Sequence, residues 1–325
     1  MASRSAFAKR SSALSQLMDA RRAWLDWAVL VALVVVWGSA FAGLKIAVEG
    51  LHPAWVASMR LAVAALALFV VLQFKREAPD RNDGRPLWPI YGAIGVFGLG
   101  LPFLLFAWAA TELPSAVLAI CNGVSPVFTA LIAHAFLANE KLNKRKTVGV
   151  GLGMVGFVAL VYPDLRGGQL GAPGLAEFAA LLGAALYAVA NVVTKRAPPA
   201  PSVTSAFMMC LTGALSTAAA ALVWSGPPPL PDSRTLIAVV ALGLLPTALG
   251  TIGYVWLIRR RGALFTSFTT YLSPVWAILI GVALLGEQPG APEYLALMLI
   301  LAGVGIANLR GKTVERPPGP ASQPA

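Results

Sequence analysis

The sequence carries little charge for its length. Charged residues make up 12% of the 325 residues, whereas hydrophobic residues make up 58%. A soluble domain carries roughly 25% charged residues. So small a polar fraction excludes a water-soluble globular protein and predicts a membrane protein.

Cysteines and chemistry-bearing clusters are also scarce. The two cysteines, Cys121 and Cys210, both lie in apolar runs, which argues against a disulfide framework. No glycine-rich nucleotide loop followed by Lys and Ser or Thr is present, so the sequence does not support ATP-driven pumping. It contains no metal-ligand cluster, catalytic pair or acid near the centre of an apolar run. We therefore expect no cofactor, no metal and no enzymatic activity, and an intramembrane enzyme is disfavoured.

Long apolar runs, separated by short breaks with Pro, Gly and charge, fill most of the chain. A membrane-spanning helix needs about 20 mostly apolar residues. By that measure we expect ten spans, at about 25–46, 53–74, 88–109, 114–137, 147–163, 174–194, 203–224, 235–257, 263–284 and 293–309.

The 25 Lys and Arg residues are distributed very unevenly between the two sides of these spans. With the N-terminus in the cytoplasm, the outer loops hold only Arg166 and Arg234, while Lys45 and Arg60 fall within helices. This is the positive-inside asymmetry. It predicts a multi-pass protein of the bacterial inner membrane with both termini in the cytoplasm. The net charge of +11 then indicates contact with membrane lipids, not nucleic acid.

The chain repeats itself. Ser125-Pro126-Val127 recurs as Ser273-Pro274-Val275, and the two apolar runs that contain them end near Glu140 and Glu287. Five spans per repeat is an odd number, so the second repeat enters the membrane from the opposite side. The predicted fold is all-α, with ten transmembrane helices arranged as two inverted five-helix repeats. The predicted organisation is a basic cytoplasmic tail (1–24), a first repeat (25–163), a periplasmic linker (164–173), a second repeat (174–309) and a disordered cytoplasmic tail (310–325).

Several stretches together resemble the EamA family of the drug/metabolite transporter superfamily. Residues 37–66 resemble the start of the family's sequences, and residues 125–160 and 273–307 resemble its later helices. The sequence departs from the family at Ala138-Asn139-Glu140, where a Gly usually precedes the Glu, and at Tyr187-Ala188, which replaces Trp-Gly. The resemblance implies a central cavity between the halves and movement of amino acids or related metabolites, often outward.

Arg60 is the charged residue placed deepest in a predicted helix. It lies seven residues past Pro53, or about 10 Å along the helix. A charge at that depth must face protein or water. A guanidinium presents a fork of donors suited to a carboxylate or phosphate, so Arg60 is a candidate substrate clamp. The alternative is a structural partner for helix-end carbonyls or for Glu49. We expect Lys45, nearer the helix end, to extend its amine to the interface.

The other candidate residues are aromatic or polar. Most membrane aromatics form interfacial belts, which we predict for Trp108, Tyr254 and Trp256. Hydroxyls and amides beside helix prolines either bind the freed backbone carbonyls or face a cavity. The predicted substrate-binding residues are Trp37, Phe41, Arg60, Asn122, Ser125, Tyr187, Asn191, Thr270, Tyr271 and Ser273.

Prolines within the apolar runs and one histidine complete the set. We predict helix kinks that allow rocking at Pro102, Pro126, Pro246 and Pro274. Histidine is the side chain that most often carries a proton in pH-dependent proteins. His134 is therefore the candidate for proton coupling, although a packing role is the more common one for such a residue.

These observations predict a secondary transporter of the inner membrane that exports amino acids or related small metabolites by alternating access. A multidrug or cation exporter and a channel-like metabolite facilitator are the alternatives. The expected partners are a small-molecule substrate and membrane lipids. The sequence does not determine the oligomeric state.

Overall fold

The computed structural model describes residues 2–75, 81–82, 85–137, 142–166, 172–266 and 268–308. Glu140, half of the predicted linker at 164–173 and the predicted tail at 310–325 lie outside these ranges. The described residues form helices, apart from a two-residue antiparallel pair of strands, β1 (Arg81–Asn82) and β2 (Arg85–Pro86). The helices are α1 (Ala2–Gly50), α2 (Pro53–Lys75), α3 (Trp88–Gly95), η1 (Val96–Gly100), α4 (Leu101–Glu112), α5 (Ser115–Gly123), α6 (Ser125–Phe136), α7 (Lys144–Arg166), α8 (Ala172–Arg196), α9 (Ser202–Ser225), α10 (Ser233–Leu242), η2 (Gly243–Leu249), α11 (Gly250–Thr266), α12 (Phe268–Leu285) and α13 (Ala291–Asn308).

Among the described residues, eight helical segments are long and apolar enough to cross a membrane. A shorter apolar helix covers Ala291–Ala307. The remaining predicted span corresponds to α7, which begins with three basic residues and then carries four glycines between positions 149 and 156. The protein is thus an all-helical membrane protein with eight candidate spans, two fewer than the ten that we expected. The candidate spans are Trp24–Gly50, Pro53–Phe74, Trp88–Glu112, Ser115–Phe136, Ala172–Arg196, Ser202–Ser225, Ser233–Ile258 and Phe268–Leu285.

Prolines coincide with changes in helix geometry. Pro102 is the second residue of α4, which begins where the π-helix η1 ends, and Pro246 lies inside the π-helix η2. Pro126 is the second residue of α6, just after the break that separates α5 from α6, whereas α12 continues through Pro274. A proline removes a backbone donor, and a π-turn is one way in which a helix absorbs that loss. In η2 the Thr247 hydroxyl donates to the Leu242 carbonyl at 2.8 Å, which satisfies an acceptor in the widened turn.

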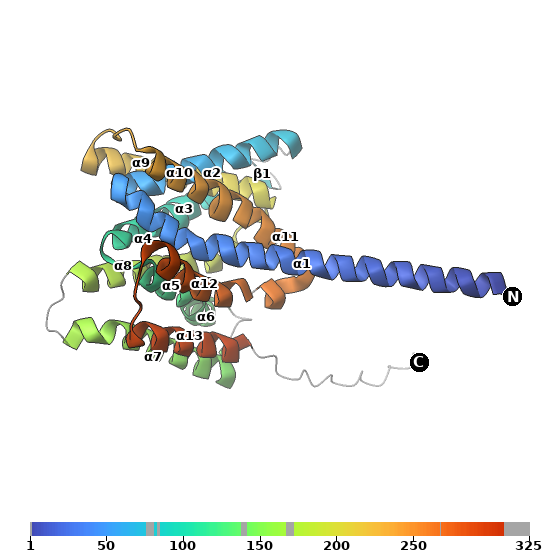
Figure 1. The fold of residues 1–325 in the computed structure, drawn as a ribbon. Coiled ribbons are helices and arrows are strands. Elements are labelled where there is room, and N and C mark those ends of the chain that lie inside the picture. The colour runs from blue at the N-terminus through green and yellow to red at the C-terminus, as the bar shows by residue number, and fades with distance from the viewer. Residues whose placement is uncertain are drawn as a thin grey trace, which may run out of the picture.

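Two groups of helices form the middle of the molecule. Each group consists of helices from one half of the sequence packed around a single helix from the other half. The α1 group consists of α1 packed against α10, η2, α11 and α12. The α8 group consists of α8 packed against α3, η1, α4, α5 and α6. The pairs α2–α9 and α7–α13 complete the bundle, with α7 and α13 side by side at one edge (Figure 1). Figure 1 also shows α1 extending past the other helices toward the N-terminus.

Glycines allow the closest of these contacts. A Cβ atom built on Gly149 of α7 would overlap the Gly303 carbonyl oxygen of α13. One built on Gly95 would overlap the Met209 carbonyl oxygen of α9. Small residues of this kind let helix backbones approach in a membrane, where burial of apolar side chains gives little driving force. Gly151, on the same helix as Gly149, faces outward, and a Cβ atom built on it would have no neighbour within 4 Å.

We expect Gly149→Ala to destabilise the α7–α13 pair, because the added methyl group overlaps backbone that cannot move aside as a side chain can. The expected loss is about 1–3 kcal/mol, as for other overpacked sites. Thermal unfolding of the purified protein in detergent measures it. Gly151→Ala on the same helix is the matched control and leaves the unfolding temperature unchanged. Equal unfolding temperatures for both variants would contradict the close contact.

Candidate functional site

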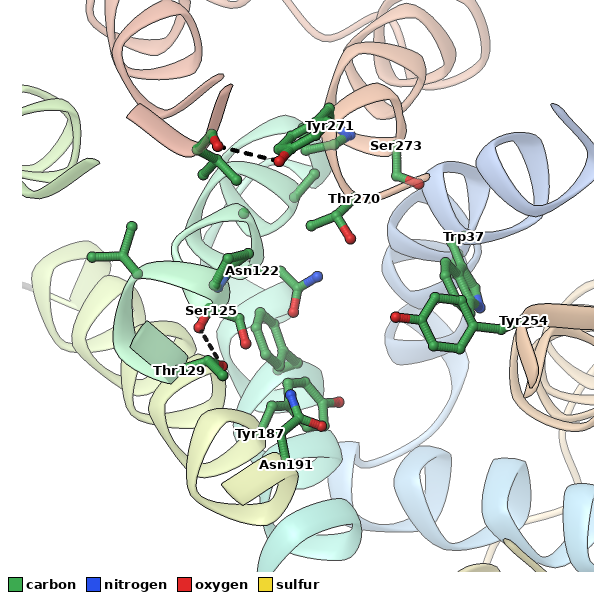
Figure 2. A pocket seen from close by; sticks show the side chains of 18 of the residues that line it. Trp37, Asn122, Ser125, Thr129, Tyr187, Asn191, Tyr254, Thr270, Tyr271 and Ser273 are labelled. Atoms are coloured by element: carbon green, nitrogen blue, oxygen red, sulfur yellow. Dashed lines mark hydrogen bonds between the residues drawn. The ribbon is translucent and has the colours of Figure 1, made fainter. Parts of the chain in front are cut away.

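A central cavity of about 700 Å³ lies between the α1 group and the α8 group. All ten residues predicted to bind substrate line it. Figure 2 shows Trp37 and Tyr254 on one wall, facing Asn122 and Ser125 across the cavity. Residues far apart in the sequence therefore share one hollow. The ten lining residues are Trp37, Phe41, Arg60, Asn122, Ser125, Tyr187, Asn191, Thr270, Tyr271 and Ser273.

The predicted kink prolines and His134 do not all line the cavity. Pro126, Pro246 and Pro274 line the cavity, whereas Pro102 is buried beside it in α4. His134 lies in the last turn of α6, outside the cavity lining, and its Nδ1 accepts a hydrogen bond from the Leu142 N–H at 3.1 Å. The cavity thus gathers the predicted binding residues and most of the predicted kinks, but not the histidine.

Arg60 binds a hydroxyl and an aromatic ring inside the cavity. Its Nε donates to Thr247 Oγ1 at 3.0 Å, and its Cζ lies 4.0 Å from the centroid of the Phe103 ring. The alternative partner, Glu49, instead pairs with Arg234 at 3.1 Å, and both of those side chains are mostly exposed. Within the described part of the chain, the two terminal guanidinium nitrogens of Arg60 donate no hydrogen bond.

The charge of the cavity has one sign. Among the described residues that line it, the basic side chains are Arg60 and Lys146, and there is no Asp or Glu. Lys146 lies in the first turn of α7, close to a helix end, while Arg60 lies deep within a span. The arrangement provides a partly buried cation without a carboxylate partner in the described lining, and such a cation attracts an anionic group on a ligand.

Several polar groups of the lining are already engaged with the backbone. Trp37 Nε1 donates to the Pro246 carbonyl at 2.9 Å, and the Tyr271 hydroxyl donates to the Val304 carbonyl at 3.2 Å. The Ser273 hydroxyl donates to the Thr269 carbonyl at 2.7 Å, whereas the carbonyl that loses its helical donor at Pro274 is that of Thr270. These contacts fix the walls and leave fewer donors for a ligand.

Two amide side chains are different. The side chains of Asn122 and Asn191 line the cavity and make no hydrogen bond within the described part of the chain. They come from α5 and α8, both of the α8 group. Each amide offers a donor and an acceptor, so this wall provides neutral hydrogen-bonding capacity opposite Trp37 and Tyr254 (Figure 2).

Sequence reasoning missed several lining residues. Tyr254, predicted as an interfacial belt residue, lines the cavity beside Trp37, with ring centroids 5.3 Å apart. The prediction was wrong because α11 begins deep in the bundle, after η2. Thr247 was also missed, and its position directly after the predicted kink at Pro246 was the available signal. Phe106, which stacks on Tyr187 at 5.9 Å, had no comparable signal.

The cavity is asymmetric along the helix axes. At one end it reaches Lys146 in the first turn of α7 and Ala307 near the end of α13. Toward the other end it stops at Leu44, Phe106 and Ala119. We call these the open end and the closed end. At the closed end the cavity is sealed by buried apolar side chains from both groups.

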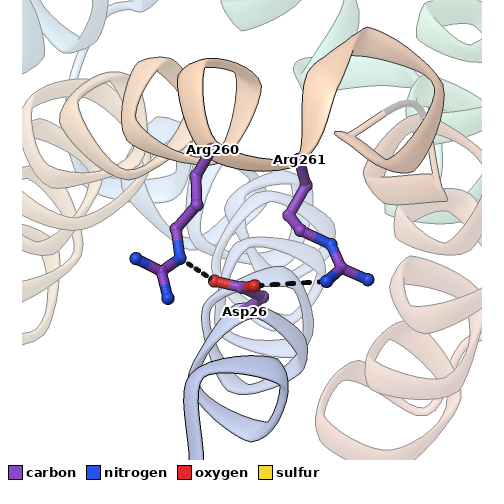
Figure 3. A network of polar contacts seen from close by, with 3 residues as sticks. All are labelled: Asp26, Arg260 and Arg261. Atoms are coloured by element: carbon purple, nitrogen blue, oxygen red, sulfur yellow. Dashed lines mark hydrogen bonds and ion pairs between the residues drawn. The ribbon is translucent and has the colours of Figure 1, made fainter. Parts of the chain in front are cut away.

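A charged cluster lies in the α1 group toward its open end. Asp26, with 3% of its side chain exposed, pairs with Arg260 through Nε and with Arg261 through Nη1, the latter at 3.5 Å (Figure 3). The two guanidinium groups also lie over Trp256 and Phe265. The cluster ties α1 to α11. Sequence reasoning did not identify it, because Asp26 lies at the boundary between the basic tail and the first span.

We expect Asp26→Asn to weaken the contact between α1 and α11. The two arginines keep their charge but lose the buried carboxylate, which costs about 1–2 kcal/mol for partners that are partly exposed. Unfolding in detergent measures the loss. Glu49→Gln, which breaks the exposed pair with Arg234, is the control and changes stability by less than about 1 kcal/mol. An effect of Asp26→Asn no larger than that of the control would show that the cluster is not structural.

Comparison with known proteins is consistent with this architecture. The model of the EamA-like transporter family matches residues 25–162 and 174–309. The uncharacterized inner membrane transporter YedA of Escherichia coli K12 is 27% identical over 284 residues, which cover 86% of this chain and 89% of that protein. A probable terminal-alkyne amino-acid exporter of Streptantibioticus cattleyicolor is 26% identical over 287 residues, covering 87% and 93%. A solved structure described as a crystal structure of a protein has a TM-score of 0.62 at 21% identity, covering 86% of this chain and 95% of that one, which supports the fold.

Proposed function

Because the chain belongs to the EamA-like transporter family, we propose that it is a secondary transporter of the bacterial inner membrane that exports amino acids or related metabolites. Similarity to YedA supports the location, and similarity to a probable amino-acid exporter supports the class of substrate. The central cavity is the proposed substrate site, and its volume of about 700 Å³ suits a small metabolite.

The proposed topology has ten spans in two inverted repeats. The two segments that match the family model support the repeats. Helix contacts support the inversion, because α1 packs on α12 and α10–α11 in the same way that α8 packs on α5–α6 and α4. In this topology α7 and α13 are the fifth and tenth spans. The positive-inside asymmetry of the basic residues supports a cytoplasmic location for both termini. In this orientation the open end of the cavity faces the cytoplasm and the closed end faces the periplasm.

The α1 group and the α8 group lie on either side of the cavity, and this arrangement supports alternating access. In the proposed orientation, their contact at the closed end would separate the cavity from the periplasm, and substrate would enter from the cytoplasm at the open end. Rocking the α1 group against the α8 group around the cavity would reverse this, with the interrupted helices as the flexible points. The proposed kinks are Pro102, Pro126, Pro246 and Pro274. The proposal gives His134 no part in coupling, since it does not line the cavity.

The observation that carries the choice of substrate is the bonding of Arg60. Its Nε is bound to Thr247, its terminal nitrogens make no hydrogen bond to the described residues, and the described lining contains no carboxylate. We propose that the free edge of the guanidinium binds the carboxylate of the substrate in a bidentate manner. Asn122 and Asn191 bind the remaining polar groups. A lining of this charge does not favour the alternative multidrug or cation exporter.

We expect Arg60→Ala to lower the transport of a carboxylate substrate by about 10- to 100-fold, the effect of losing one charged hydrogen-bonding partner in a buried site. Arg60→Lys keeps the charge but loses the planar fork, so it retains intermediate activity. Uptake of labelled amino acids into inverted vesicles measures both. Arg234→Ala, at the exposed pair with Glu49, is the control and transports normally. Full transport by Arg60→Ala at normal expression would reject the clamp.

A further inference from the structure

Two charged side chains hold the turn between α4 and α5 at the closed end. Lys45 Nζ donates to the carbonyls of Ala110 and Leu113, both at 3.0 Å, where α4 ends. Glu287 accepts from the N–H of Ser115 at 2.6 Å and from the N–H of Ala116 at 3.2 Å, where α5 begins. The first N–H groups and the last carbonyls of a helix have no partner within the helix. A cation at a helix C-terminus and an anion at a helix N-terminus are both favourable.

These contacts join the two groups of helices. Lys45 belongs to α1 and Glu287 closely follows α12, so both come from the α1 group. The turn that they hold belongs to the α8 group. Toward the open end, by contrast, Asp26 pairs with Arg260 within the α1 group. There Arg196 donates to the Phe136 carbonyl within the α8 group.

The chain around Glu287 is shaped to present this carboxylate. Gly286 has a φ of 65°, a left-handed conformation that turns the chain at the end of α12. The Glu287 N–H then donates to the Gly281 carbonyl at 3.1 Å. A Cβ atom built on Gly281 would overlap Glu287 Oε2 and lie 2.7 Å from Ser115 Oγ. The space that the glycine leaves is filled by the carboxylate and by the hydroxyl, which donates to Glu287 Oε2 at 2.9 Å.

We propose that Lys45 and Glu287 form a periplasmic latch, which keeps the closed end shut and must release before substrate leaves the cavity. The periplasmic assignment rests on the proposed function, while the contact itself does not. Both side chains are only partly buried, and both bind backbone groups. Water can therefore replace the protein partners of each charge on opening, so the latch can break and reform without stranding a buried charge. Directly inside the latch, Leu44 and the Phe41–Phe106 contact, with ring centroids 6.2 Å apart, form the apolar seal.

The test uses a cysteine placed behind the latch. Leu44→Cys, in a protein in which Cys121 and Cys210 are replaced by alanine, is labelled with a membrane-impermeant maleimide in right-side-out vesicles. Removing a contact that exists only in the closed state shifts the population toward the open one. We expect Glu287→Gln and Lys45→Met each to raise the labelling rate at least about five-fold. Gly281→Ala, which keeps the charge but displaces the carboxylate, gives the same increase.

Glu293→Gln is the matched control. Glu293 lies six residues after Glu287, and its carboxylate accepts from the Gly290 N–H at 2.9 Å within the same segment, so it joins no two groups. Labelling of this variant stays at the parent rate. Unchanged labelling in Lys45→Met, Glu287→Gln and Gly281→Ala, with normal membrane insertion, would overturn the latch. If the increase is found only in inverted vesicles, the latch stands and the proposed orientation fails. If labelling rises as predicted but no variant or parent protein transports amino acids, the latch stands and the proposed substrate fails.

Discussion

A cation inside a membrane-spanning helix is the constraint on which the rest of this structure depends. Placing Arg60 there costs roughly 2.5–3.5 kcal/mol on insertion scales, so it cannot face lipid. The fold meets this constraint with the Thr247 hydroxyl, the face of Phe103 and the central cavity, which Arg60 lines. Thr247 is available because η2 widens the helix around Pro246. The π-helix, the partly buried cation and the central cavity therefore form one arrangement.

The same physical problem, backbone polar groups away from water, recurs at each interruption. In lipid every freed carbonyl or N–H needs a partner from the protein. Trp37 donates to the carbonyl of Pro246, and Glu287 accepts from the N–H of Ser115 at the start of α5. The bonds that Lys45 and Glu287 make join the α1 group to the α8 group at the closed end of the cavity. In the latch that we propose, the same bonds satisfy backbone groups of α4 and α5 and control access to the cavity.

Much of the fold was predictable because its signals are local. Apolar length located the helices, and the repeated Ser-Pro-Val led to residues that meet in one cavity. We expected ten spans, whereas eight described segments are long and apolar enough to cross a membrane. The difference arises at α7 and α13, whose glycines and short apolar stretches are not taken into account when only the length of a segment is counted. The expectation that Lys45 extends to the interface did not identify its actual partners, the carbonyls of Ala110 and Leu113.

What the sequence could not indicate is pairing between distant helix ends. Asp26 meets Arg260 and Glu287 meets Ser115 across separations of 234 and 172 residues, and no periodicity encodes those contacts. Glu49 was a reasonable partner for Arg60 by proximity in the sequence, but it lies at the exposed end of α1 and pairs with Arg234. Tyr254 was placed at the surface because its distance from a helix end was counted along a helix that η2 in fact interrupts.

The most direct test of the central claim is the binding of a series of compounds that differ only in charge. Phenylpropanoate, phenylalanine and phenylethylamine share one ring and carry an anion, a zwitterion and a cation. Equilibrium binding to the purified protein, measured by calorimetry, should be strong for the first two and absent for the third, because Arg60 lies in a lining whose described residues include no carboxylate. Tighter binding of the amine than of the two carboxylates would contradict the account.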